Sequence, residues 1–291
     1  MTERRAIDGF GATALIGFSF LMSLNQVVIK LTTEGMAPVA QAGVRSVAAV
    51  GVLLLWIWLR RARLTLAPGA MVWGIVSGLF FAAEFFCIFI ALDLTTVSRA
   101  SIILYSMPVW LALAGHFLLP GERLSVVRAV GLALALLGVV IAMGDRSNGT
   151  ASLLGDVLAL CGALFWAGIA LLVRVTPLSQ TPPVTQLMFQ VAISGPLLLL
   201  AAPMFGPMIR EFEPIHVGML AFQAIGIASL GFLGWFWLLT IYRASSVASF
   251  AFLSPVLSVL LGWALLGEHI GPLIWVALAL VAVGIFLINR R

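Results

Sequence analysis

Long apolar runs, separated by short polar segments, follow one another along the whole chain. Runs such as Phe10–Ile29 and Ala244–Gly267 contain no charged residue, and each is long enough to cross a hydrocarbon core about 30 Å thick. The pattern predicts an all-α integral membrane protein with ten transmembrane helices and no extramembrane domain. The predicted helices are 10–30, 37–59, 70–92, 98–119, 125–144, 154–174, 184–205, 215–240, 244–266 and 270–289.

The pattern of the chain also repeats once. The segment from Tyr105, YSMPVWLALAGHFLLPGERL, returns from Phe252 as FLSPVLSVLLGWALLGEHI. The loop 144–150 separates two halves with five predicted spans each, so the expected domains are residues 1–147 and 148–291. A unit with an odd number of spans must insert its second copy upside down, which predicts two inverted five-helix repeats. The aligned pairs are Pro108 with Pro255, Gly115 with Gly262, Glu122 with Glu268, and Gly138 with Gly284.

Composition and charge agree with a membrane protein and exclude other classes. With 62% hydrophobic and 9% charged residues among 291, the chain is too apolar for a water-soluble domain. The net charge of +5 indicates no nucleic-acid partner, because the arginines lie in short loops, where they determine topology. On the side of both termini fall Arg4, Arg5, Arg60, Arg61, Arg63, Arg123, Arg128, Arg174, Arg243, Arg290 and Arg291, against Lys30, Arg99, Arg146 and Arg210 on the other. This excess predicts that both termini are cytoplasmic.

Glu84 is the first candidate for function, because it lies well inside the third predicted span. A charged group at the bilayer centre costs about 2.5–3.5 kcal/mol on insertion scales, so it needs a partner, water or a proton. The position equivalent to Glu84 in the second half is close to Gly231. Glu84 is therefore expected to be a proton-coupling carboxylate or a ligand for a cationic or amine group. The alternative is a structural partner for Arg45 or for backbone groups.

The second helix of each half carries two polar residues four positions apart, which places them on one helix face. These pairs are Gln41 with Arg45 and Gln186 with Gln190. They are candidates for substrate contact or for hydrogen bonding between helices. Arg45 lies deep in its span, where it could pair with Glu84, receive a substrate anion or satisfy backbone carbonyls.

Two amides in the first span, Asn25 and Gln26, are candidates to line a pathway near the membrane midplane. Lys30 follows one turn beyond Gln26 and is expected to extend to the outer interface. Glu122 and Glu268 follow glycines at helix ends, where each is expected to cap the helix that comes next.

Proline occurs at equivalent places, Pro108 and Pro255, inside the fourth and ninth predicted spans. Proline removes a backbone donor and kinks a helix, and matching kinks in two halves point to a binding site. The alternative is a kink that serves packing alone. Aromatic residues that could line such a cavity are Tyr105, Phe252, Trp166 and Trp235.

Several segments together resemble the drug/metabolite transporter superfamily, in its ten-span EamA-type branch. They are NQVVIK, the Pro38, Gln41 and Arg45 pattern, LGDVLALCGALFWA with LLVR, SMPVWLALAGHFLLPGERL and LSPVLSVLLGWALLGEHI. The resemblance implies a helical bundle with a cavity between its halves that opens alternately to each side. Members of the family move amino acids, nucleobases, vitamins, sugars or toxic cations, many of them with ion gradients. The chain departs from the family at 20–23, where Trp-Gly-Ser is often found.

The sequence contains no nucleotide-binding loop, metal-ligand spacing or catalytic cluster, so no enzyme activity, cofactor or metal is expected. The main hypothesis is a secondary transporter, an ion-coupled exporter of a small metabolite in a bacterial inner membrane. One alternative is a multidrug or organic-cation exporter with Glu84 as its cation or proton site. Another, from a different class, is a non-transporting assembly partner or lipid-processing component. The expected partners are a small-molecule substrate and the lipid bilayer, with protons and a second copy of the chain as further candidates.

Overall fold

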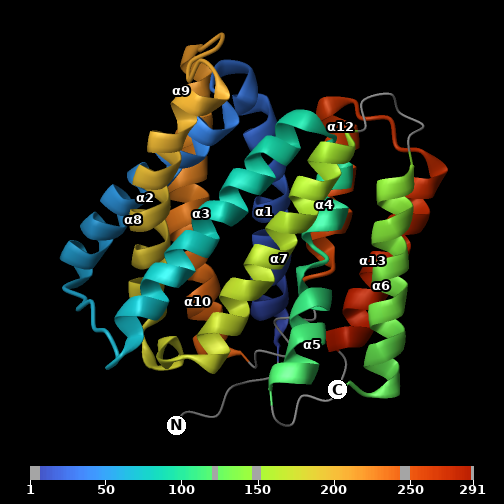
Figure 1. Ribbon diagram of the computed structural model, residues 1–291, viewed down its shortest axis with the longest axis horizontal. Helices are drawn as coiled ribbons and strands as arrows, with labels where there is room; N and C mark the ends of the chain where they lie inside the picture. Colours follow the sequence, from blue (N-terminus) through green and yellow to red (C-terminus); the bar gives the residue numbers. More distant parts are fainter. Residues whose placement is uncertain (1–6, 120–123, 146–151, 243–249, 290–291) are drawn as a thin grey trace.

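The computed structural model describes residues 7–119, 124–145, 152–242 and 250–289, and within these ranges the regular structure is helical (Figure 1). Nine of the described helical segments are long and apolar enough to span a membrane, and Leu253–Leu266 is shorter. The all-α membrane class is therefore confirmed. The start of the predicted span 244–266 lies outside the described residues. The elements are α1(Gly9–Gly35), α2(Pro38–Arg60), α3(Ala70–Leu94), α4(Val97–Leu104), α5(Met107–Leu118), α6(Val126–Gly144), α7(Leu153–Val175), η1(Pro177–Gln180), α8(Pro183–Ala201), η2(Ala202–Phe205), α9(Pro214–Ala221), the π-helical η3(Phe222–Gly231), α10(Phe232–Ile241), α12(Leu253–Leu266) and α13(Pro272–Asn289).

Helix starts follow the local sequence. Proline opens several helices, because its missing N–H falls among the donors that lack an intrahelical partner there. Such prolines are Pro38, Pro183, Pro214 and Pro272. Polar side chains cap other helices: Asp8 accepts from the amide of Gly11 at 2.7 Å, and Ser152 accepts from Gly155 at 3.2 Å. These caps fix where α1 and α7 begin.

The first helix is longer than the sequence predicts, because α1 continues to Gly35 instead of ending near residue 30. The charge of Lys30 suggests a helix end at the interface, but the ammonium group donates to the carbonyls of Leu92 and Thr95, both at 2.7 Å. Lys30 is only partly buried, so its extension toward the interface stays a prediction. Its partners are carbonyls at the end of α3, and α1 passes beyond it.

The helix of the fourth predicted span breaks before Pro108 instead of bending at it. α4 ends at Leu104 and α5 begins at Met107, so Pro108 occupies the first turn of α5. In the second half, α12 begins at Leu253, directly after a turn at residues 250–252. Proline is tolerated in the first helical turn. The predicted kink at Pro108 is therefore an interruption, whereas the chain just before 250 lies outside the described residues, so the kink at Pro255 stays a prediction.

The helices of the two halves pack against each other along the molecule. α2 lies beside α8 at one edge and α6 beside α13 at the other, with α1, α3, α4 and α7 between these pairs (Figure 1). α1 begins and α13 ends at the same end of the bundle, called here the terminal end. The loops α1–α2, α3–α4 and α12–α13 lie at the opposite end, called the distal end.

Small residues allow the closest of these contacts. A Cβ atom on Gly131 would lie 2.8 Å from the carbonyl oxygen of Gly284, and one on Gly138 would lie 2.7 Å from that of Ala277. The backbones of α6 and α13 therefore touch, which requires glycine at these positions.

Candidate functional site

Two oppositely charged residues are buried close to the middle of the bundle. Glu84 of α3 is 8% exposed and Arg45 of α2 is 3% exposed. The guanidinium group of Arg45 lies over the rings of Phe85 and Phe89, 4.5 and 5.6 Å from their centroids. The two charges attract each other. Two adjacent helices therefore bring a carboxylate and a guanidinium to one place in the bilayer.

This charged pair lacks the hydrogen bonds that normally accompany buried charges. Among the described residues, Arg45 and Glu84 form no hydrogen bond, and no ion pair within 4 Å joins them. The Nε atom of Arg45 is fully buried without a partner. Buried charges without hydrogen bonds are strongly destabilising. Such residues inside a membrane protein are typical of substrate or ion pathways.

Helix α1 carries further buried polar atoms without partners. The side-chain oxygens of Asn25 and Gln26 on α1 are buried and accept no hydrogen bond from the described residues. The hydroxyl group of Tyr105 at the end of α4 lies near the side chains of Gln26 and Ser254. The break between α4 and α5 therefore places a phenol beside the amides of α1.

The aromatic candidates Tyr105 and Trp166 meet at this break, with ring centroids 5.9 Å apart in an edge-to-face arrangement. One turn from Trp166, a Cβ atom on Gly162 would lie 3.4 Å from Leu104 and 3.7 Å from the backbone oxygen of Glu84. Helices α3, α4 and α7 thus converge here. We call Asn25, Gln26, Arg45, Glu84, Tyr105 and Trp166 the central cluster.

Gln41 does not reach this cluster. Its amide nitrogen donates to the carbonyl of Ile29 and to the side chain of Gln223, both at 3.2 Å, and Gln223 donates to Thr32 at 3.0 Å. These bonds tie α1, α2 and η3 together. The sequence analysis missed Gln223, because a single amide in an uncharged span gives no signal without knowledge of its partner.

The polar pair of the second half also contacts other helices and loops. Gln186 donates to the carbonyls of Leu178 and Thr181 at 2.9 and 2.8 Å, and Gln190 donates to Ser77 of α3 at 3.1 Å. Their amide donors are therefore used in packing between α8, η1 and α3. The structure does not bring them to Glu84.

The remaining aromatic candidates lie apart from the charged pair. Trp235 stacks on Phe18 with ring centroids 4.7 Å apart, and Phe252 meets Phe286 edge-on at 6.4 Å. The contact of Trp235 and Phe18 adjoins an apolar groove of about 510 Å³ between α1 and α10. Phe252 immediately precedes α12.

Glu268 caps a helix other than the one expected. Its carboxylate accepts from the amides of Val97 and Ser98, at 2.5 and 3.0 Å, and from the Ser98 hydroxyl at 2.5 Å. It therefore caps α4 of the first half, and the prediction that it caps the next helix is wrong. Glu122, its repeat equivalent, lies outside the described residues.

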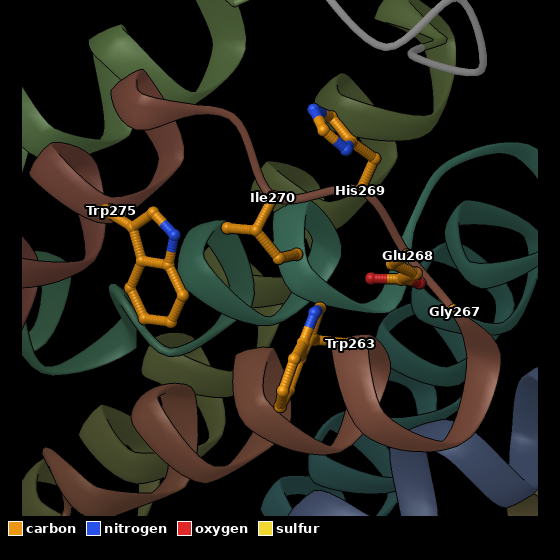
Figure 2. Close-up of a pocket in the computed structure, with 6 residues that line it drawn as sticks. All are labelled: Trp263, Gly267, Glu268, His269, Ile270 and Trp275. Carbon is orange, nitrogen blue, oxygen red and sulfur yellow. The ribbon is translucent and has the colours of Figure 1, made fainter.

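A surface pocket of about 290 Å³ lies beside Glu268 at the distal end, lined by Trp263, His269, Ile270 and Trp275 (Figure 2). Trp263 and Trp275 are exposed, as is typical of tryptophan at a membrane–water interface. The pocket shares no residue with the central cluster.

A second buried charge pair joins the two halves near the distal end. Arg99 of α4 and Asp156 of α7 are 2.6 Å apart, with side chains 2% and 0% exposed. Arg99 also donates to the backbone carbonyl of Asp145. The sequence analysis counted Arg99 only among the positive charges opposite the termini and did not single out Asp156. The aspartate in LGDVLAL was a signal that could have been used.

Comparison with known proteins agrees with this architecture. The EamA-like transporter family matches residues 9–144 and again residues 153–290. The uncharacterized transporter YoaV of Bacillus subtilis (strain 168) is 23% identical over 94% of each chain. The uncharacterized inner membrane transporter YedA of Escherichia coli (strain K12) is 24% identical over 99% of this chain and 93% of its own.

A third relative, also from Escherichia coli (strain K12), carries the name probable amino-acid metabolite efflux pump. It is 26% identical over 91% of this chain and 89% of its own. A solved crystal structure shares the fold with a TM-score of 0.69 at 21% identity, over 95% of this chain and 97% of that chain. Because the family matches nearly the whole chain, this protein belongs to the EamA-like transporter family.

Proposed function

We propose that the protein is a secondary transporter that exports a small metabolite by alternating access, with Glu84 as the site that couples export to a proton gradient. The observation that carries this proposal is the pair of Glu84 and Arg45, buried together without hydrogen bonds in the middle of a membrane bundle. Neither a protein partner nor a lipid is needed to explain this buried pair. A substrate that enters the cluster would supply the missing partners.

Alternating access is supported by the way the proposed repeats, 1–147 and 148–291, pack. Exchanging the two halves maps α6 against α13 and α2 against α8 onto themselves, and it turns the contact of α5 with α7 into that of α12 with α1, which is also present. It turns the contact of α3 with α7 into that of η3 and α9 with α1, which is also present. An inverted pair of repeats with this symmetry can open to either side by a rocking motion of similar parts.

Proton coupling follows from competition at one carboxylate. A buried carboxylate can bind a proton or the cationic group of a substrate, but binding of one weakens binding of the other. Export of the substrate in exchange for a proton results if each is released on the opposite side. The relative named as an efflux pump supports the outward direction.

A simple organic-cation exporter is a weaker alternative. A ligand with only positive charge would be attracted by Glu84 but repelled by the guanidinium of Arg45, which is buried beside it. A buried like charge has few compensating solvent interactions. The central cluster therefore favours a substrate that also carries negative charge.

The first test of transport compares metabolites in cells and medium for cultures expressing the wild type, Glu84→Gln or the control Glu211→Gln, whose carboxylate is exposed at the distal end. We expect one or more compounds to accumulate in the medium with the wild type and the control, but not with Glu84→Gln at equal membrane abundance. Equal accumulation with Glu84→Gln would remove Glu84 from the mechanism. Profiles identical to empty-vector cells for every variant would contradict export.

A further inference from the structure

We propose that a line of hydroxyl groups between α4 and α12 binds water and passes protons from Glu268 at the distal end to Tyr105 of the central cluster. We call this line the hydroxyl seam, and it consists of Ser98, Ser101, Ser254 and Ser258. The inference rests on the proposed function, since it names the route by which the coupling proton enters.

The packing of α4 against α12 places the seam between two contacts. At the distal side, a Cβ atom on Gly262 would lie 3.0 Å from the hydroxyl oxygen of Ser98. At the central cluster, the hydroxyl group of Tyr105 lies near the side chain of Ser254. The two helices therefore run antiparallel in a defined register, with the middle of each between these contacts.

Ser101 and Ser258 occupy the middle of this register. Ser101 lies three positions after Ser98, and Ser258 lies four positions before Gly262, spacings that put side chains on one helix face. Both serine side chains are 0% exposed, and neither hydroxyl oxygen has a hydrogen-bond partner among the described residues. A buried polar group without a partner is costly. The middle of the seam therefore has donors and acceptors that bound water would satisfy.

Several other buried hydroxyl groups do have partners. Thr32 donates to a carbonyl one turn earlier at 2.6 Å, and Ser194 donates to the hydroxyl group of Ser46 at 3.0 Å. A bond to the preceding turn is the common solution for such residues in a helix. Ser101 and Ser258 form neither kind of bond. They therefore differ from hydroxyl groups that serve helix packing alone.

The spacing of the seam suits a relay through water. Side chains three or four positions apart on a helix have Cβ atoms about 5–6 Å apart, and two O–H···O bonds in series span about 5.5 Å. One water molecule therefore fits between successive hydroxyl groups. Each hydroxyl group or water both accepts and donates, so each oxygen takes a proton from one neighbour and gives its own to the next. One proton enters, one proton leaves, and only O–H bonds form and break.

The outer end of the seam is a carboxylate at the protein surface. Glu268 is partly exposed beside the distal pocket (Figure 2) and accepts from the Ser98 hydroxyl at 2.5 Å. Lys30 of α1 interacts with its charge, and His269 is its neighbour in the chain. Glu268 can therefore take up protons from water at the distal end, which is predicted to face the outside, and pass them to Ser98.

The inner end of the seam lies close to the backbone of Glu84. The hydroxyl group of Tyr105 lies near the side chain of Gln26 as well as Ser254. A Cβ atom on Gly162 would lie 3.4 Å from Leu104 and 3.7 Å from the backbone oxygen of Glu84, so α3 and α4 approach each other where the seam ends. The seam thus gives protons a route to the central cluster that does not require α4 and α12 to separate.

The first test detects water in the seam. The full-length protein in lipid nanodiscs is exposed to hydroxyl radicals generated by X-rays, which oxidise side chains beside bound water. The chain has two tyrosines, and both are buried, with Tyr105 8% and Tyr242 2% exposed. We expect Tyr105 to be oxidised at least fivefold faster than Tyr242, and at least threefold more slowly in Ser101→Ala/Ser258→Ala than in the wild type. Equal oxidation of the two tyrosines, or an unchanged rate in the variant, would overturn the proposal.

The second test follows the proton. Infrared spectroscopy of the same nanodiscs measures the carboxylic-acid band that is lost in Glu84→Gln, after a rapid drop in pH. This band should appear at least tenfold more slowly in Ser101→Ala/Ser258→Ala than in the wild type or in the control Ser194→Ala, which removes a buried hydroxyl group elsewhere. The two single variants are measured as well, in case the double variant does not fold. Equal rates in folded variants, or a wild-type band that does not respond to pH, would overturn the relay.

Transport separates this inference from the proposed function. In vesicles, gradient-driven export of the compound that accumulates in the culture medium should be at least tenfold slower in the double variant. Exchange of that compound without a proton gradient should stay within twofold of the wild type. Unchanged gradient-driven export, or a tenfold loss of both rates, would overturn the relay and keep the transporter. Export of no compound by cells, with rapid protonation of Glu84 that depends on the two serines, would contradict the transporter and keep the relay.

Discussion

Two buried charge pairs differ in how many hydrogen bonds their polar atoms form. Arg99 and Asp156 are 2.6 Å apart, and Arg99 also donates to backbone carbonyls at the end of α6. Arg45 and Glu84 are equally deep but lack hydrogen bonds among the described residues. A charge pair whose polar atoms are hydrogen-bonded stabilises one arrangement of helices. A pair without hydrogen bonds still has donors and acceptors that a ligand can use. We therefore assign the first pair to structure and the second to binding.

Replacing Asp156 tests the structural assignment. Asp156→Asn would leave Arg99 buried without its counter-charge, which typically costs about 3–5 kcal/mol. We expect a clearly lower unfolding temperature in detergent, and partial recovery in Arg99→Met/Asp156→Leu, where neither charge remains. An unfolding temperature equal to that of the wild type for Asp156→Asn would show that this pair contributes little.

Single residues also show what the sequence could predict of the candidate site. Glu84 and Arg45 stand out because a charged residue inside a membrane span is costly and therefore needs a partner or a function. Ser254 and Gln223 have no such signal, since hydroxyl and amide groups are common in membrane helices. Their roles depend on partners such as Tyr105 and Gln41, which are far away in the sequence.

At the scale of helices, the short segment α4 has its two ends in different environments. Its first turn is capped by Glu268 from the α12–α13 loop. Its last residue precedes Tyr105, which belongs to the central cluster. Gly262 allows this cap, because a Cβ atom there would lie 2.6 Å from the Glu268 carboxylate. When the halves move relative to each other at the distal end, the contact between Glu268 and α4 must therefore either break or move as a unit.

Glu268→Gln is expected to ease opening at the distal end. Loss of a charged cap costs a helix about 1–2 kcal/mol, which corresponds to an open population about 5–30-fold larger. The measurement is labelling of Ser101→Cys by a membrane-impermeant maleimide, in a background with Cys87→Ser and Cys161→Ser. Faster labelling is expected with Glu268→Gln than with Glu211→Gln. Equal rates would show that Glu268 does not hold the distal end closed.

The apolar pattern predicted the helices well, but not how they end. Most boundaries agree within a few residues, because span length and hydrophobicity are set by the bilayer. The sequence analysis failed where a distant partner decides the outcome. Lys30 donates to two carbonyls at the end of α3, and Glu268 caps a helix about 170 residues away in sequence. Neither partner can be found from local pattern.

At the scale of the whole molecule, the distal end joins the two halves through the backbone. Met36 and Ile209 form an antiparallel bridge, the amide of Ala37 donates to the carbonyl of Met208 at 2.9 Å, and Arg210 pairs with Asp93 at 3.0 Å. Together with Glu268, these contacts close the bundle at this end. Under the proposed alternating access, these contacts would have to open before the central cluster could reach the distal side.

We predict the orientation of the molecule in the membrane from the exposed arginines at each end. At the terminal end, Arg60, Arg61 and Arg63 are exposed, and such residues are typically retained in the cytoplasm. At the distal end, Lys30 and Arg99 are occupied by partners within the bundle. The bias toward cytoplasmic termini is therefore stronger than the sequence count suggests.

Reporter fusions measure this orientation directly. A green fluorescent protein fused after Arg291 should fluoresce, and alkaline phosphatase at the same place should be inactive, because its disulfides form only outside the cytoplasm. Alkaline phosphatase inserted in the loop 206–213 should be active. The opposite pattern would place the distal end in the cytoplasm. Closure by Glu268 and the Met36–Ile209 bridge would then shut the cluster off from the cell interior, and the direction proposed for transport would have to be reconsidered along with the topology.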